Sequence, residues 1–249
     1  MNKQIITSLC DMKSKPHINS FLETQLLFGE QVSILEKFNN WFYCKTINDD
    51  YLGWIENHNL GICSKHTHVV QNLMCHCYEK DDIKSKVVKN LFFNSKVTII
   101  DEKGNWQLTK IDGKVVYIFK KHLLKKNTTA LNWVDYALHF KRVPYLWGGK
   151  SILGIDCSGL VQISLNIAGY DFPRNSKDQF NYLNNKSLKN IERGCLIFWN
   201  GHVAIAIDTK NIIHSNAYHL SVVTENFYEA QKRIKNNYGD ILGIKKVDY

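Results

Sequence analysis

The sequence has few of the residues and segments that mark several large classes of protein. Only 3 of its 249 residues are Pro and 14 are Gly, which excludes collagen-like and proline-rich chains. No run of eighteen apolar residues is present, so no membrane-spanning helix is expected. The first residues lack the continuous apolar segment of a secretory signal, and we therefore expect a cytoplasmic protein. The 44% hydrophobic and 22% charged residues are typical of a folded chain.

Metal-site and cofactor motifs are scarce. The seven cysteines are expected to be reduced thiols in a chain without an export signal. Cys75, His76 and Cys77 form the densest cluster of potential ligands, but their spacing fits none of the common zinc patterns. On a strand, Cys75 and Cys77 would share one face, which favours buried thiols over metal ligands. No glycine-rich phosphate loop is evident either, and we expect no cofactor.

The positive charge is unevenly distributed. The net charge is +9, with −2 in residues 1–61, +7 in residues 62–126 and +4 in residues 127–249. Such a basic middle region could mark a surface for nucleic acid or another anionic polymer. Its lysines are scattered without clustered arginines or interleaved aromatics, so we favour solvated lysines and expect neither a nucleic-acid nor a membrane partner.

An internal repeat divides the first half of the chain. Residues 26–36 align with residues 91–101 at an offset of 65, and Asn40-Trp41 aligns with Asn105-Trp106 at the same offset. Short alternating strands broken by Asn, Asp and Gly predict two small barrels. The pair resembles two tandem bacterial SH3-type domains, expected over residues 1–61 and 62–126. The second repeat has Val116-Tyr117 in place of Gly53-Trp54, which favours a spacer role.

The character of the sequence changes after residue 126. Thr128 or Thr129 is predicted to cap a helix that ends before Pro144, and a second helix is predicted from Cys157 to about Ala168. Four later apolar runs read as strands, over residues 195–199, 202–207, 212–214 and 222–223. Helices followed by antiparallel strands predict an α+β domain over residues 127–249.

Cys157 has the sequence context of a nucleophile. It follows Gly154-Ile155-Asp156 and begins a predicted helix, where the dipole and unpaired N–H groups favour a thiolate. The prediction is therefore a lowered pKa for Cys157, with the same N–H groups available to an oxyanion. A single cysteine in a helix is more often structural, so the assignment depends on finding a base.

Two histidines supply candidate partners for that thiol. His202 opens one predicted strand and His214 ends the next, so a short hairpin would place both beside the helix start. His202 can accept the thiol proton and later return it to the leaving amine. His214 can fix the tautomer of His202. The predicted catalytic set is Cys157, His202 and His214.

The motifs together resemble one known family. Pro144-Tyr-Leu-Trp-Gly-Gly, Asp156-Cys157-Ser158-Gly159, Pro173-Arg174-Asn175-Ser176 and Gly201-His202-Val are similar to the linked motifs of NlpC-type cell-wall cysteine peptidases. The resemblance implies an α+β papain-like cysteine peptidase domain preceded by two small all-β SH3-like barrels. It also implies hydrolysis of the bond from γ-D-glutamate to a diamino acid in murein peptides such as L-Ala-γ-D-Glu-diaminopimelate.

The resemblance also implies substrate-binding residues. Tyr145 would assist the oxyanion, Trp147 would line the pocket, and Ser158 and Ser176 would hold the D-Glu carboxylate. Asp156, Tyr51 and Glu23 would anchor a free amine of L-Ala. The resemblance is to the subgroup of this family that has two SH3-type domains and cleaves free cell-wall peptides. Asn175 stands where that subgroup commonly has Asp, so its contribution to amine binding would carry no charge.

Two alternatives stay open at this level. The chain could be a cell-wall amidase on the same fold, or a non-catalytic peptidoglycan-binding protein. The Cys157, His202 and His214 set argues against the second, because a binding protein needs no nucleophile. We expect a murein peptide as the partner of a monomeric enzyme; the sequence does not decide between diaminopimelate and lysine.

Overall fold

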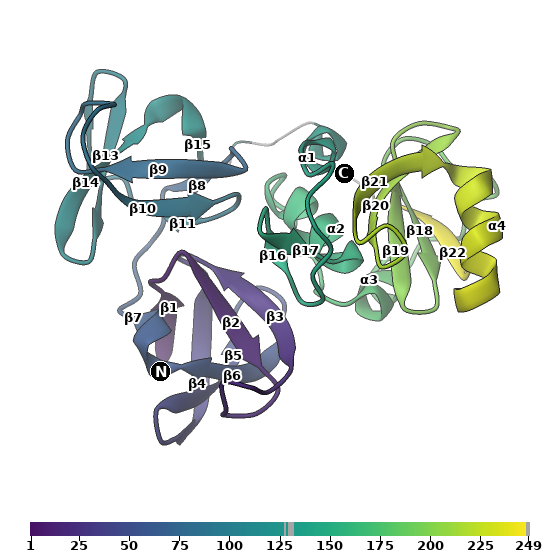
Figure 1. Cartoon of the computed structure of the whole chain (residues 1–249), viewed down its shortest axis with the longest axis horizontal. Helices are drawn as coiled ribbons and strands as arrows, with labels where there is room; N and C mark the ends of the chain where they lie inside the picture. The colour runs from purple at the N-terminus through teal and green to yellow at the C-terminus, as the bar shows by residue number, and fades with distance from the viewer. Residues whose placement is uncertain (127, 129–131, 248–249) are drawn as a thin grey trace. The chain divides into compact units, whose positions relative to one another are not determined.

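A computed structural model describes residues 1–126, 128 and 132–247, and the chain forms two compact units, Met1–Thr128 and Thr129–Tyr249 (Figure 1). The boundary lies close to the predicted change after residue 126. Residues 127, 129–131, 248 and 249, which include the predicted helix cap Thr129, lie outside the described residues. No helix in the described part of the chain is long and apolar enough to cross a membrane.

The first β region contains one seven-stranded sheet in the order β3-β2-β6-β5-β4-β1-β7. The strands are β1 (Asn2–Ile5), β2 (Leu9–Lys13), β3 (Leu22–Leu27), β4 (Gln31–Phe38), β5 (Trp41–Thr46), β6 (Leu52–Glu56) and β7 (Leu60–Gly61), with the 3-10 helix η1 (Asn57–Asn59) before β7. Alternating side chains such as Val32, Cys44 and Ile55 are fully buried and form its core.

The second β region has a five-stranded sheet, β10-β9-β14-β13-β12, and a three-stranded sheet, β11-β8-β15. Its strands are β8 (His68–Val70), β9 (Met74–Tyr78), β10 (Val87–Phe92), β11 (Lys96–Val97), β12 (Asp101–Lys103), β13 (Trp106–Ile111), β14 (Lys114–Phe119) and β15 (Leu123–Lys125), with η2 (Lys120–His122) before β15. Cys75 and Cys77 are buried in its core on one face of β9, which confirms their interpretation as buried thiols.

The internal repeat is visible in the strand pairing. The pairs β2–β3, β2–β6, β5–β6 and β1–β7 recur as β9–β10, β9–β14, β13–β14 and β8–β15. Trp41 and Trp106 each begin the equivalent strand, and Ile55 and Ile118 are equivalent buried positions. The long strand β4 corresponds to the two short strands β11 and β12. The two segments that align in sequence therefore share the same scheme of strand pairing.

The second unit is α+β, as predicted. Its five-stranded sheet has the order β21-β20-β19-β18-β22, with α4 on one side and α1–α3 on the other (Figure 1). The helices are α1 (Trp133–His139), α2 (Cys157–Asn166), α3 (Ser176–Tyr182) and α4 (Phe227–Tyr238). The strands are β16 (Lys150–Ser151), β17 (Gly154–Ile155), β18 (Cys195–Trp199), β19 (His202–Ala206), β20 (Asn211–Asn216), β21 (Ser221–Asn226) and β22 (Gly243–Lys246).

The four predicted strands and the helix that begins at Cys157 are confirmed. The first helix starts later than predicted, because Asn132 rather than Thr128 is its N-cap residue. β18 and β19 are wholly buried and β20 is buried apart from Asn211, whereas β21 is mostly half-buried. The sheet packs on one face against α2 and on the other against α4. This packing fixes the start of α2 and the start of β19, where Cys157 and His202 lie.

Candidate active site

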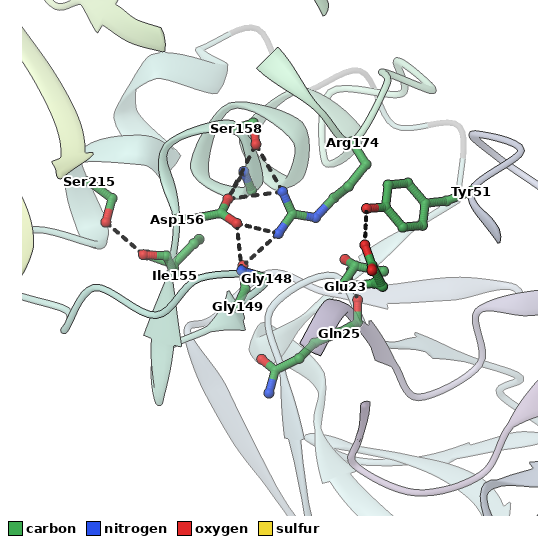
Figure 2. A network of polar contacts seen from close by, with 12 residues as sticks. Glu23, Gln25, Tyr51, Gly148, Gly149, Ile155, Asp156, Ser158, Arg174 and Ser215 are labelled. Carbon is green, nitrogen blue, oxygen red and sulfur yellow. Dashed lines mark hydrogen bonds and ion pairs between the residues drawn. The ribbon is translucent and has the colours of Figure 1, made fainter. Parts of the chain in front are cut away.

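Asp156 organises the turn that leads into α2. Its Oδ1 accepts a hydrogen bond from Gly159 N at 2.7 Å, which makes Asp156 the N-cap of the helix. Its Oδ2 accepts from Gly148 N at 2.8 Å (Figure 2). One buried carboxylate thus ties the glycine-rich approach to the first turn of α2. These bonds also fix the position of Cys157, which is the first residue of α2.

Arg174 completes this network from the loop before α3. Its Nη1 lies 2.9 Å from Asp156 Oδ1 and its Nη2 lies 2.6 Å from Asp156 Oδ2, a bidentate pair with both side chains buried. Nη1 also donates to Ser158 Oγ at 2.9 Å (Figure 2). The sequence motif contains Arg174 but gave no reason to assign it a role. Asp156 and Ser158, predicted to bind substrate, both bond to Arg174, and their contact with substrate stays a prediction.

Two glycines allow the backbone around Asp156 to pack this closely. A Cβ at Gly159 would lie 2.6 Å from Gly149 O, and a Cβ at Gly149 would lie 2.4 Å from Gly154 O. Both contacts are shorter than any side chain tolerates. Ser215 Oγ donates to Ile155 O at 2.6 Å, which links β20 to the same turn (Figure 2). The motif glycines are therefore required by close backbone approach.

A pocket opens beside Cys157 and brings the predicted catalytic residues together. Residues from the approach to α2, from the β19–β20 hairpin and from α4 line it: Tyr145, Trp147, Cys157, Gly201, His202, His214, Asn216, Ala217, Tyr218, Arg233, Ile234, Asn237 and Tyr238. Tyr145 is half-buried and is held by a backbone hydrogen bond to Leu220 O. Trp147 is 69% exposed at the rim. The pocket has the concave form and convergent polar groups of a binding site.

The two histidines contact each other directly. His202 Nε2 lies 2.8 Å from His214 Nδ1, and both rings are buried. The β19–β20 pairing, in which Ile205 opposes Ile213, puts the two rings on the same face of neighbouring strands. The hairpin predicted from the sequence is confirmed, and it places His214 where it can orient His202.

The structure reverses the predicted direction of the pKa shift at Cys157. Burial raises the pKa of this thiol to about 12, and the charge of Asp156 adds to the increase. The backbone N–H groups of Val203 and Ser158 lower the pKa, but burial outweighs them. The residue is still partly exposed to the pocket. The free enzyme therefore holds a neutral thiol, which must lose its proton as it attacks.

Burial also keeps the two histidines neutral. It lowers the pKa of His202 to about 3, with the neighbouring His214 contributing in the same direction. It lowers the pKa of His214 as well, against the opposing effect of Glu225. A neutral His202 has a lone pair free to accept a proton across the neutral range, but with its pKa near 3 it is a weak base unless the positive charge that it gains is stabilised. Burial raises the pKa of Tyr145 far above neutrality, so its hydroxyl remains a hydrogen-bond donor.

The remaining predicted residues lie as follows. Ser176 is the first residue of α3 and is partly exposed, and Asn175 is exposed with its Nδ2 bonded to Asp178 at 3.2 Å. In the first unit, Tyr51 donates to Glu23 Oε2 at 3.3 Å (Figure 2). Tyr51 and Glu23 thus form one polar pair, and their role in amine binding stays a prediction.

We expect acid to destabilise this site. The unfolded chain protonates His202 near pH 6.5, whereas the folded protein does so only near pH 3, so unfolding takes up a proton and stability falls as the pH is lowered. The loss between pH 7 and pH 5 should be about 2 kcal/mol from His202 alone. Urea denaturation followed at both pH values measures it. His202→Asn should shrink this loss and the exposed His139→Gln should not; an equal loss in all three proteins would contradict the prediction.

Sequence comparisons match two parts of the chain to known families. Residues 142–237 match the NlpC/P60 family, and residues 13–60 match the bacterial dipeptidyl-peptidase SH3 domain. The chain is 24% identical over 239 residues to dipeptidyl-peptidase 6 of Lysinibacillus sphaericus, covering 87% of this chain and 88% of that protein. It is 23% identical over 238 residues to the gamma-D-glutamyl-L-lysine dipeptidyl-peptidase of Bacillus subtilis, covering 86% and 80%.

Structural comparison shows the fold. The crystal structure of an NlpC/P60 family protein from Bacillus cereus is similar with a TM-score of 0.83 at 18% identity, covering 99% of each chain. The papain-like fold of the second unit is thereby confirmed. The SH3 match covers the first of the two β regions. That residues 62–126 form a second SH3-type domain stays a prediction, supported by the repeated strand pairing.

Proposed function

We propose that this chain, which combines an NlpC/P60 peptidase domain with a bacterial SH3 domain, hydrolyses the bond between γ-D-glutamate and a diamino acid in murein peptides. The observation that carries the proposal is one pocket lined by Cys157, His202 and His214, with Tyr145 and Trp147 at its wall. The name of the Bacillus subtilis relative, gamma-D-glutamyl-L-lysine dipeptidyl-peptidase, supports the same bond type. Peptidoglycan turnover or recycling would supply such peptides.

The first half-reaction forms an acyl-enzyme. Cys157 transfers its proton to His202 and its sulfur attacks the γ-carbonyl carbon of D-Glu. The carbonyl oxygen gains negative charge, which the backbone N–H groups at the start of α2 and the hydroxyl of Tyr145 can stabilise. The C–N bond then breaks, and His202 returns the proton to the leaving amine of the diamino acid.

Water completes the cycle. A water molecule gives a proton to His202 and its oxygen attacks the thioester carbon, after which the C–S bond breaks and the thiol regains its proton. His202 therefore gains and loses one proton in each half-reaction. Because His202 and Cys157 are both neutral at rest, each half-reaction begins and ends without net charge.

A peptide digest followed by mass spectrometry tests the proposal. The substrates are L-Ala-γ-D-Glu-diaminopimelate, its lysine counterpart and the N-acetylated form of each. We expect cleavage that releases the free diamino acid from at least one of the unblocked peptides. Cleavage of the unblocked peptides alone would support recognition of a free amine, for which Glu23→Gln and Tyr51→Phe are the diagnostic variants.

The other outcomes are equally specific. Equal cleavage of the acetylated and free peptides would indicate an endopeptidase that acts on longer or blocked wall fragments. Intact peptides in every reaction would contradict the proposed bond and would favour an amidase. The Cys157→Ala protein is the control for any contaminating peptidase.

A further inference from the structure

The chain of hydrogen bonds that begins at His202 continues beyond His214. His214 Nε2 lies 2.5 Å from Glu225 Oε1, and Arg233 donates to both oxygens of that carboxylate, at 2.6 Å and 2.5 Å. Glu225 lies on β21 and Arg233 on α4. None of the motifs of the sequence includes either residue. Four side chains thus form one continuous polar chain from the pocket to the helix.

Strand register brings Glu225 to His214. In the β20–β21 pair His214 opposes Val223 and Ile212 opposes Glu225, so Glu225 is the diagonal neighbour of His214 on the same face of the sheet. Burial opposes the ionisation of Glu225, but the hydrogen bonds from His214 and Arg233 outweigh it and lower its pKa to about 2. Glu225 is therefore a carboxylate that can only accept hydrogen bonds.

Arg233 fixes the carboxylate in place. Its guanidinium binds both oxygens in the fork geometry that such pairs prefer, and it lies over the ring of Tyr218 at 4.6 Å from the centroid. The hydrogen bonds from Arg233, one of them to the same oxygen that contacts His214, thus hold Glu225 Oε1 in position. A carboxylate held this firmly can determine which ring nitrogen carries the proton.

The bonding pattern assigns the protons. Because Glu225 accepts, His214 Nε2 carries the hydrogen, and in a neutral ring Nδ1 is then an acceptor. His202 Nε2 must therefore donate to His214 Nδ1, which leaves the lone pair of His202 on Nδ1. That nitrogen can take the proton of Cys157. When it does, His202 becomes an imidazolium whose positive charge is linked through His214 to the negative charge of Glu225.

We propose that Glu225, held by Arg233, is a positioning residue that sets the tautomers of His214 and His202 for proton transfer from Cys157. The proposal deepens the proposed function, because it needs His202 to act as the base of a thiol reaction. It does not depend on which murein peptide is the substrate.

Asn216 also contacts His214, and it favours the opposite tautomer to the one that Glu225 favours. Its Nδ2 lies 3.0 Å from His214 Nε2, and its Oδ1 is oriented by accepting from His219 N at 2.8 Å. An amide donor at this position favours a bare Nε2, the opposite tautomer. The charged contact at 2.5 Å is the shorter and stronger of the two, so Glu225 prevails. Without the charge, the amide of Asn216 would decide.

Glu225→Gln is the decisive variant. The glutamine has one acceptor oxygen where Glu225 has two, so it cannot accept both hydrogen bonds from Arg233 and also the bond from His214. With the charge lost and an amide donor in the site, we expect His214 and His202 to adopt the opposite tautomers. The expected result is a fall in kcat of about 100-fold with KM changed less than about twofold. Alkylation of Cys157 by iodoacetamide at pH 7, mapped on its own peptide by mass spectrometry, should slow at least about tenfold.

Nitrogen-15 NMR of the histidine rings separates positioning from a merely structural role. In the unmodified protein the proton of His202 should lie on Nε2, and in Glu225→Gln on Nδ1. Glu229→Gln is the matched control, since Glu229 is an exposed carboxylate in the first turn of α4, and all readouts should stay unchanged.

Two results would overturn the proposal. One is a His202 proton on Nδ1 in the unmodified protein, which requires no variant to fold. The other is a folded Glu225→Gln protein with unchanged tautomers and an unchanged alkylation rate. A failure of the proposed function looks different: the murein peptides stay intact while the tautomers and the alkylation rates follow the expectation.

Discussion

Replacing Cys157 with Ala should lower the rate of murein-peptide cleavage by at least about ten-thousand-fold while leaving the fold intact. The thiol is the nucleophile in both half-reactions, and no other side chain among the residues that line the pocket can replace its sulfur. The structural cost should be small, because the turn around residue 157 is held by the side chains of Asp156 and Arg174. The free energy of unfolding should change by less than about 1 kcal/mol.

Cys63→Ala is the matched control, since Cys63 is the other partly exposed free thiol and lies in the first unit. Its cleavage rate should equal that of the unmodified protein. Rates are read by mass spectrometry on the unblocked peptides, and folding by circular dichroism and urea denaturation. A Cys157→Ala protein that cleaves at the normal rate would eliminate the thiol mechanism outright.

Replacing Arg174 with Met should produce the largest loss of stability. The change leaves the carboxylate of Asp156 buried without its countercharge, and breaking a buried pair in this way costs about 3–5 kcal/mol. For a domain of this size we expect the melting temperature to fall by about 10–20 °C. Activity should fall as well, because Asp156 and Ser158 flank the nucleophile and both bond to Arg174.

An exposed ion pair in the same unit supplies the comparison. Arg193 pairs with Asp135 at 2.7 Å with both side chains about half exposed, and Arg193→Met should cost less than about 1 kcal/mol. The double variant Asp156→Asn, Arg174→Met removes both charges and should recover part of the stability. If the Arg174→Met and Arg193→Met proteins were equally stable, the prediction that the buried pair contributes more stability than the exposed pair would be wrong.

Local sequence patterns were sufficient for the elements that carry the catalytic residues. Apolar runs predicted the strands that hold His202 and His214, and the residues that follow the glycine-rich approach predicted a helix that starts at Cys157. The repeat marks at Trp41 and Trp106 predicted two similar β regions, and the same strand pairing is found in both. These features depend on neighbours in the chain, so they can be read without tertiary information.

Several features could not be predicted from the sequence, and each of them depends on contacts between residues that are distant in the chain. The pKa of Cys157 is set by how deeply the domain buries it, which the helix dipole argument does not include. Arg174 reaches Asp156 across eighteen positions of sequence. Glu225 could have been found by extending the predicted hairpin: with a turn after residue 216, its position on the next strand places it diagonally from His214.

The sheet order of the second unit has a consequence for how the chain folds. β18 pairs with β19 directly after it, but its other edge is covered by β22, where Cys195 opposes Lys246. During synthesis, one edge of β18 therefore stays unpaired until β22, about fifty residues later, has been made. Pairing over this distance is expected to be slow. Half of the strand pairs of the first unit join neighbours in sequence, as in β2–β3, β4–β5 and β5–β6, whereas others, such as β1–β7, also close over a long segment. The first unit is synthesised before β18, so the β-rich unit can fold while the sheet that carries the histidines still lacks an edge strand.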